Sequence, residues 1–375
     1  MAQFGNKSGR NITDLIFQRE HGTESLPLKY EIAKLKTEQL TYSSYVRSQD
    51  VVGKECGFLE VSNTGYPIGV FYEDVAFRYS VRRYSAIHQF IIQYNSPCGG
   101  VRNKPYPLVK KVRWRESPLE HMEVTDVKVV DLKNQTICLF CGNSVKYSGI
   151  VATVILDKST DKESSYEWRC KKNVWCCCYN SFLNRFAVGC DGGYHCFGIS
   201  HFGNLRKMTC NVTAMGFNNE GNVLYCGTDK CGVAAHDLRE NLHQNSTAVS
   251  TENVKEMQLL SDDVSLVVSG TNGKLLKIDT RMKKTVFQYS EHIESSKRKP
   301  FSLSEDLDVI CGVGDDNLIR IWSLSTGKLL RLFDEIPDHN PQCCLVSEQR
   351  RWFVFLIQDF EFSLISCDEI NTLIE

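Results

Sequence analysis

Two short motifs place an aspartate and an arginine two positions apart, a pattern suited to recognising an acidic partner. They are Asp237-Leu238-Arg239 and Asp279-Thr280-Arg281, and their aspartates lie 42 residues apart. A guanidinium presents a planar fork of donors to a carboxylate, and an aspartate two residues earlier can orient that fork. One such arginine alone would be interpreted as a solvated surface residue. Two arginines at matched positions of a repeat predict a single partner that contacts both.

No catalytic motif is recognisable, and we predict that the protein is not an enzyme and needs no cofactor. The sequence has no Gly-x-Ser-x-Gly elbow and no His-Glu-x-x-His motif. The nearest approach to a phosphate-binding loop is Gly189-Cys190-Asp191-Gly192-Gly193. This run lies between two strand-like segments, without a following helix whose dipole could hold a phosphate. We interpret it as a hairpin turn.

The 17 cysteines include three in succession, Cys176, Cys177 and Cys178. Adjacent strand residues point to opposite faces, so the three cannot all face one metal ion, and we expect no metal site. The start, Met1 to Lys7, lacks the layout of a signal peptide. We therefore expect a soluble intracellular protein whose thiols are reduced and mostly structural.

The most basic stretch, residues 104–115, has aromatic residues among its charges. It contains Lys104, Lys110, Lys111, Arg113 and Arg115 with Tyr106 and Trp114. Such a stretch can face nucleic acid, but it is also typical of a solvated edge strand or loop. Because 44 basic residues are balanced by 45 acidic ones, for a net charge of -1, we do not expect nucleic-acid binding.

The two motifs belong to a repeat that predicts the fold. Residues 224–239, 266–281 and 309–323 each contain a buried strand, a tight polar turn, a second strand and a closing position, which is 237, 279 or 323. The spacings of 42 and 44 match the period of a propeller blade, about 40–45 residues. Weaker copies occur upstream, within residues 70–197, and one downstream, at 352–366. We predict an all-β fold, a seven-bladed WD-repeat β-propeller.

Two details of this propeller can be predicted. The last blade lacks an outer strand, and we expect Gly57–Ser62 to supply it, because an open edge would expose unpaired backbone groups. In the blade that ends at 323, we expect Trp322 to pack between sheets and Asp316 to accept a hydrogen bond from His292.

The first fifty residues have a different pattern, which predicts a short helix–loop–helix arm. A first helix covers Ile12–His21, and a second begins near Pro27. An apolar stripe follows the second helix and comprises Leu28, Ile32, Leu35, Tyr42 and Val46. The stripe either packs on the edge of the propeller or docks in a partner's groove. The predicted domains are the arm at 1–50, the propeller at 55–367 and a tail at 368–375.

Paired Asp-x-Arg boxes on adjacent blades resemble the adaptor-binding signature of cullin-4 ubiquitin ligase substrate receptors. Residues 226–324 resemble the family of the fourth damaged-DNA-binding-adaptor/cullin-4-associated factor, also called the WD repeat protein twenty-one family. The likeness rests on Asp237-Leu238-Arg239, on Gly273-Lys274-Leu275 before Asp279, and on Arg320-Ile321-Trp322-Ser323-Leu324. His236 and Ile278 stand where the family usually has tryptophan, and Ser323 replaces a third aspartate.

The resemblance implies a non-catalytic substrate receptor. It implies that the damaged-DNA-binding adaptor, and through it cullin-4 and a RING subunit, binds one set of residues. These are Asp237, Arg239, Asp279 and Arg281, aided by Leu28, Ile32 and Leu35 of the arm. The client protein is not identified by the sequence. The alternative is a WD-repeat scaffold of a chromatin or ribonucleoprotein complex without a ligase. Either function places the protein in the nucleus, the cytoplasm or both, away from membranes, since no run of about 18 apolar residues occurs.

Overall fold

Strands make up nearly all of the regular structure. The computed structural model describes residues 26–38, 41–45, 55–61, 67–77, 80–94, 107–113, 122–144, 148–157, 162–198, 203, 205–239, 246–250, 253–270, 273–292, 301–334, 342–348, 351–358 and 361–366. No helix within these ranges is long and apolar enough to cross a membrane.

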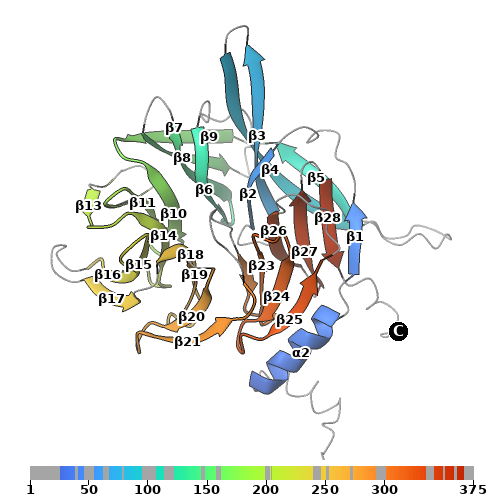
Figure 1. Ribbon diagram of the computed structural model, residues 1–375. Helices are drawn as coiled ribbons and strands as arrows, with labels where there is room; N and C mark the ends of the chain where they lie inside the picture. The colour runs from blue at the N-terminus through green and yellow to red at the C-terminus, as the bar shows by residue number, and fades with distance from the viewer. Residues whose placement is uncertain are drawn as a thin grey trace, which may run out of the picture.

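The described strands form seven four-stranded antiparallel sheets (Figure 1). The first sheet contains β2 (Glu55–Val61), β3 (Pro67–Phe77), β4 (Ser80–Tyr94) and β5 (Pro107–Arg113). The second contains β6 (Met122–Asp131), β7 (Gln135–Ser144), β8 (Gly149–Asp157) and β9 (Lys162–Cys170). The third contains β10 (Val174–Asn180), β11 (Arg185–Cys190), β12 (Gly193–Gly198) and β13 (Leu205–Lys207).

The fourth sheet contains β14 (Val212–Phe217), β15 (Val223–Thr228), β16 (Val233–Asp237) and β17 (Ser246–Ser250). The fifth contains β18 (Val254–Leu259), β19 (Ser265–Gly270), β20 (Leu275–Asp279) and β21 (Lys284–Tyr289). The sixth contains β22 (Ser302–Ser304), β23 (Val309–Val313), β24 (Ile319–Ser323) and β25 (Leu329–Phe333). The last contains β26 (Gln342–Glu348), β27 (Arg351–Gln358), β28 (Glu361–Ser366) and β1 (Thr41–Tyr45).

Neighbouring sheets pack through their innermost strands and form a closed ring. The strand β2 contacts β6, β6 contacts β10, β10 contacts β14, β14 contacts β18, β22 contacts β26, and β26 contacts β2. The fifth and sixth sheets share a cluster that includes Leu275, Tyr289 and Trp322. The middle strands of the sixth sheet, β23 and β24, are buried on both faces, as their Val/Ile-rich runs require. The predicted all-β propeller is confirmed, and the sheets among the described strands equal the predicted blades in number.

The closing strand is not the one that we predicted. Thr41–Tyr45 (β1) pairs with β28 and completes the last sheet, whereas the segment near Phe58 to Val61 belongs to β2 and pairs with β3. The predicted apolar stripe of the second helix includes Tyr42. The run Thr-Tyr-Ser-Ser-Tyr at 41–45 favours a strand instead. The N-terminal side of the chain still closes the ring, through a segment that was assigned to the arm.

Besides β1, the described part of the arm is one helix, α2 (Leu26–Glu38), which packs on β24 and β25 (Figure 1). Ala33 and Thr37, one turn apart, are fully buried, whereas Leu35 is 57% exposed. Arg331 Nη1 donates to the carbonyl oxygen of Thr37 at 2.7 Å, which places a cation at the C-terminal end of the helix. Among the described side chains of α2, Ala33 and Thr37 therefore form the packing face, whereas Leu35 of the predicted stripe does not. The predicted helix at 12–21 and the position of Val46 lie outside the described residues.

The set predicted around Trp322 is partly confirmed. Trp322 is fully buried, donates from Nε1 to the carbonyl oxygen of Ser290 at 2.7 Å, and packs edge-on against the ring of His292. Asp316, however, accepts two hydrogen bonds from Arg320, at 2.9 and 2.6 Å. The side chain that binds the Asp316 carboxylate is thus the guanidinium of Arg320, where we expected the imidazole of His292.

The cysteine run lies in β10 and points alternately to two cores, as the strand geometry predicted. Cys177 joins the cluster of Leu139 and Phe186, whereas Cys176 and Cys178 join the neighbouring cluster. Burial raises the pKa of Cys177 and Cys178 well above the ordinary value, which keeps these thiols protonated. One pair departs from the prediction of reduced thiols, because Cys210 and Cys231 form a disulfide with Cα atoms 6.3 Å apart.

Two further predictions concern the basic stretch and the glycine-rich run. The described part of the basic stretch, Pro107–Arg113, is β5, at the edge of its sheet, as one interpretation expected. Residues 104–106, 114 and 115 lie outside the described residues. The glycine-rich run forms the hairpin between β11 and β12, where Gly192 has a φ of 62° that favours glycine.

Candidate functional site

The two Asp-x-Arg motifs occupy the same position in consecutive sheets. Asp237 ends β16 and pairs with Val223, while Asp279 ends β20 and pairs with Ser265. In each motif the middle residue donates its backbone N–H to the turn before the second strand: Leu238 N to Asn222 O at 2.8 Å, and Thr280 N to Val264 O at 2.9 Å. The backbone therefore presents both arginines at the same end of neighbouring blades.

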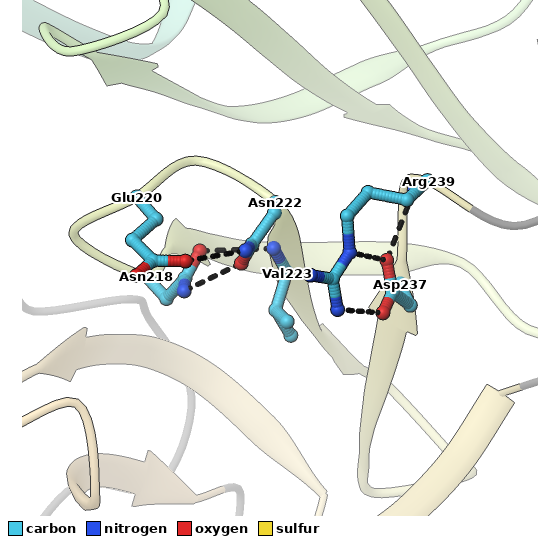
Figure 2. Close-up of polar contacts among 6 residues, drawn as sticks. All are labelled: Asn218, Glu220, Asn222, Val223, Asp237 and Arg239. Atoms are coloured by element: carbon cyan, nitrogen blue, oxygen red, sulfur yellow. Dashed lines mark hydrogen bonds and ion pairs between the residues drawn. The ribbon is translucent and has the colours of Figure 1, made fainter.

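Arg239 is held by its own aspartate (Figure 2). Its Nε and Nη2 donate to the two oxygens of Asp237 at 3.0 and 2.6 Å, and its backbone N–H donates to Oδ1 at 2.9 Å. The side-chain hydrogen bond from Arg239 lowers the pKa of Asp237 to about 2 from its ordinary value of 3.8. The Arg239 side chain is nevertheless 67% exposed, so the oriented guanidinium is accessible to a partner.

Arg281 repeats this arrangement with a looser ion pair. Asp279 Oδ1 accepts the backbone N–H groups of Arg281 and Met282, each at 2.9 Å, which fixes the turn. The guanidinium lies 3.8 Å from Asp279 Oδ2, and the Arg281 side chain is 75% exposed. Each aspartate thus shapes its turn, and each arginine extends into solvent.

The next sheet uses the same position differently. Ser323 ends β24, and Leu324 N donates to Asp308 O at 3.0 Å, so the backbone bond of the other two blades recurs. Here the hydroxyls of Ser323 and Ser325 both donate to Asp308 Oδ2, at 2.9 and 2.7 Å. The side chains of this turn are therefore directed inward. The two Asp-x-Arg motifs lie in the two preceding blades, as the sequence predicted.

Side chains link the turns at this end of the ring laterally. Asn180 Nδ2 donates to the carbonyl oxygens of Asn218 and Asn219 in the next blade, at 3.0 and 3.1 Å. Asn219 in turn donates to Asp263 and Ser261, and Ser261 donates to Glu305. The turn that neighbours Arg239 is also braced internally, since Asn218 Nδ2 donates to Asn222 Oδ1 at 2.7 Å (Figure 2). Four consecutive blades therefore present one connected surface, which we call the turn face.

The helix α2 meets the same end of the ring. Lys328, in the connection from β24 to β25, lies with its Nζ 5.3 Å from the centre of the Tyr30 ring. This connection corresponds to the turns that contain Arg239 and Arg281, so the Tyr30 end of α2 adjoins the turn face. Ile32 is half-buried and Leu35 mostly exposed, while nothing of the Leu28 side chain is described.

The turn face also carries three exposed apolar residues that no sequence pattern had indicated. Phe182 and Leu183, in the turn from β10 to β11, are 76% and 39% exposed, and Met282, beside Arg281, is 62% exposed. The available signal was local: Ser181-Phe182-Leu183-Asn184 has the length and flanking residues of a strand-to-strand turn, where apolar residues are unusual. Within the described ranges, no group of three or more His, Cys, Asp or Glu side chains is placed to hold a metal ion.

The fold is that of a β-propeller, and the turn face presents two oriented, exposed arginines at one end of its blades. Residues 197–344 match the model of the DDB1- and CUL4-associated factor 4 beta-propeller domain, and this range contains both Asp-x-Arg turns. The predicted resemblance to this family of cullin-4-associated factors is thus confirmed over that segment.

Curated relatives match a shorter segment. The human DDB1- and CUL4-associated factor 4-like protein 2 is 39% identical over 77 residues, which cover 20% of this chain and 20% of that protein. The human DDB1- and CUL4-associated factor 4 is 35% identical over 78 residues, or 21% of this chain and 16% of that protein. Its bovine counterpart is 33% identical over a segment of the same length. The matched segment spans a fifth or less of each relative.

Proposed function

We propose that this protein is a non-catalytic substrate receptor that docks on the DDB1 adaptor of a CUL4 RING ubiquitin ligase and presents client proteins for ubiquitination. The observation that carries the proposal is the pair of oriented, exposed arginines at matched positions of consecutive blades. Arg239 and Arg281 are 67% and 75% exposed, and the aspartate of each motif fixes the turn beneath it. Two guanidinium forks on one connected surface suit a partner that bears two acidic groups.

The location of the helix supports the same docking surface. The Tyr30 end of α2 lies beside Lys328, at the end of the ring that carries both arginines. A partner that covers the turn face would therefore also reach the first turns of α2. We propose that Leu28, Ile32 and Leu35 contribute there, together with Asp237, Arg239, Asp279 and Arg281.

The proposed function requires no chemistry from this chain. A receptor of this kind holds its client close to a ubiquitin-conjugating enzyme, so its effect is an increase in effective concentration. Clients would bind at the opposite end of the ring, because the adaptor would cover the turn face. The proposal does not specify the client or its recognition sequence. The complex would act in the nucleus, the cytoplasm or both.

A charge reversal at both arginines tests the proposal. We expect Arg239→Glu with Arg281→Glu to weaken binding of purified DDB1 by at least a hundredfold, because each buried charge-assisted contact is worth about 2–5 kcal/mol. Both side chains are largely solvent-exposed, so the melting temperature should stay within 1–2 °C of the wild type, roughly as expected for surface changes. The affinity is measured by calorimetry, and folding by circular dichroism.

A matched control separates this effect from net charge. Arg169→Glu with Lys171→Glu makes the same change in charge on an exposed part of another blade, where the Arg169 side chain is 55% exposed. This variant should bind DDB1 like the wild type. A folded Arg239/Arg281 variant that binds DDB1 with wild-type affinity would contradict the proposal and favour a scaffold without a ligase.

A further inference from the structure

The turn between β10 and β11 extends an aromatic side chain into solvent, whereas the matching turns of the next three sheets carry acids. Phe182 is 76% exposed, and Leu183 beside it is 39% exposed. In the turn of the same length between β22 and β23, the matching residue is the exposed Asp306. The turns of the two sheets in between carry Glu220 and Asp262, which are exposed as well. Among these four turns, Phe182 is therefore the one exposed aromatic residue.

The fold does not require Phe182. Polar groups set the shape of its turn, since Asn180 Oδ1 accepts the backbone N–H of Leu183 at 2.8 Å and Asn184 adopts a φ of 51°. The Nδ2 group of Asn180 fastens the turn to the next blade through the carbonyl oxygens of Asn218 and Asn219. A phenylalanine so exposed gains little free energy from burial within the chain. It is rigidly presented and available to a partner.

Phe182 lies on the turn face, at the same end of the ring as the two arginines. The third, fourth and fifth sheets present Phe182 with Leu183, then Arg239, then Arg281 with the 62% exposed Met282. The centres of protein interfaces are enriched in aromatic residues, arginine and methionine, and a few such residues supply most of the binding energy. The basic groups are thus flanked by apolar side chains, on a row of blades joined by side-chain hydrogen bonds.

We propose that Phe182 and Leu183 form the apolar anchor of the docking surface for the DDB1 adaptor, which receives Phe182 in an apolar pocket beside the acidic groups that meet Arg239 and Arg281. This inference rests on the proposed function and extends it beyond the matched segment, because residues 182 and 183 lie outside 197–344. The adaptor, and not a client, is the occupant, because Phe182 shares one end of the ring and one hydrogen-bonded row of turns with the arginines.

The test compares Phe182→Ser with an equally exposed apolar residue elsewhere. Val286, on the outer strand β21, is 53% exposed and provides the control Val286→Ser. Binding of purified DDB1 to the full chain is measured by calorimetry. We expect Phe182→Ser to weaken it at least tenfold, about 1.4 kcal/mol. Phe182→Leu should recover most of the loss, Val286→Ser should change affinity less than twofold, and all three should melt like the wild type.

Photo-crosslinking supplies a second, independent readout. A benzophenone analogue of phenylalanine at position 182 should cross-link to DDB1. The same analogue at Tyr166, which is 43% exposed on the outer strand β9, should not.

The outcomes separate the anchor from the proposed function. If the wild type binds DDB1 and the double arginine reversal abolishes binding, but Phe182→Ser binds normally and position 182 does not cross-link, the anchor is wrong and the proposed function stands. If the wild-type chain does not bind DDB1, both are overturned. Weak binding by Phe182→Ser, with recovery in Phe182→Leu and cross-links from position 182 alone, supports the anchor.

Discussion

At the end of its third strand, the sheet β18–β21 carries Asp279, and the neighbouring sheet β22–β25 carries Ser323. The two residues have the same register, and each is followed by a residue whose N–H bonds to the turn before the second strand. In the sheet β18–β21 the turn extends Arg281 into solvent, with 75% of its side chain exposed. In the sheet β22–β25, Ser323 is fully buried next to the fully buried Trp322, and its hydroxyl donates a hydrogen bond to Asp308.

The comparison teaches that one backbone position can serve recognition or stability. Where the tryptophan is present, as in β24, the position after it is linked inward to Asp308. Where Ile278 takes the place of tryptophan, the turn instead holds an exposed arginine. We infer that the sixth sheet stabilises the ring and that the fourth and fifth sheets contact the partner. Three substitutions test this division.

The largest effect is expected at Trp322. Replacing it by alanine removes a fully buried ring that packs on Tyr289 and His292 and bonds to Ser290, so a cavity opens between two blades. We expect Trp322→Ala to lower the free energy of unfolding by about 3–5 kcal/mol, measured by urea denaturation. Met282→Ala in the neighbouring blade should change it by less than about 0.5 kcal/mol. Equal effects of the two would refute the division.

A smaller loss is expected at Ser323. Its hydroxyl donates to Asp308 Oδ2 at 2.9 Å, and Asp308 is itself buried. Ser323→Ala should lower the free energy of unfolding by about 1.5–3 kcal/mol, because a hydrogen bond to a charged group is lost. Ser325→Ala removes the second bond to the same oxygen, from a less buried position, and should cost less. The division would be weakened if Ser323→Ala left the urea midpoint unchanged.

The smallest effect concerns the pH dependence of the Arg239 turn. The pKa of Asp237 is about 2 in the folded chain, below its ordinary 3.8, so the pair with Arg239 stabilises the fold above pH 3.8. That contribution is lost as the pH falls from 3.8 towards 2. In Arg239→Ala we expect the pKa of Asp237 to rise towards 3.8, as followed by NMR of its carboxyl carbon. An unchanged pKa would mean that Arg239 does not orient on Asp237 in solution.

Much of the fold could be predicted because it depends on local patterns. Buried runs such as Val309–Val313 must be strands, and the polar residues between runs must be turns, so the repeat positions 237, 279 and 323 were assigned correctly. The alternation of side chains in a strand was also enough to predict that the cysteine run could not face one ion.

The candidate site could be predicted only in part. The paired arginines followed from spacing, since a repeat places equivalent residues at equivalent positions. The inward turn at Ser323 needed the structure, because its partner Asp308 is 15 residues away along the chain. The role proposed for Phe182 depends on which turns lie side by side, and the hydrogen bonds from Asn180 to Asn218 and Asn219 decide that.

The amino-acid sequence by itself determined the strands, the turns, the period of the blades and the two Asp-x-Arg boxes, because these depend on residue type and local spacing. Only the tertiary structure decided that Thr41–Tyr45 closes the ring and that Ala33 and Thr37 form the packing face of α2. It also decided that Arg320, and not His292, binds Asp316. The physical reason is the same in each case. A strand edge, a helix face and a carboxylate can each be satisfied by several segments, and only the packing of the whole ring selects one.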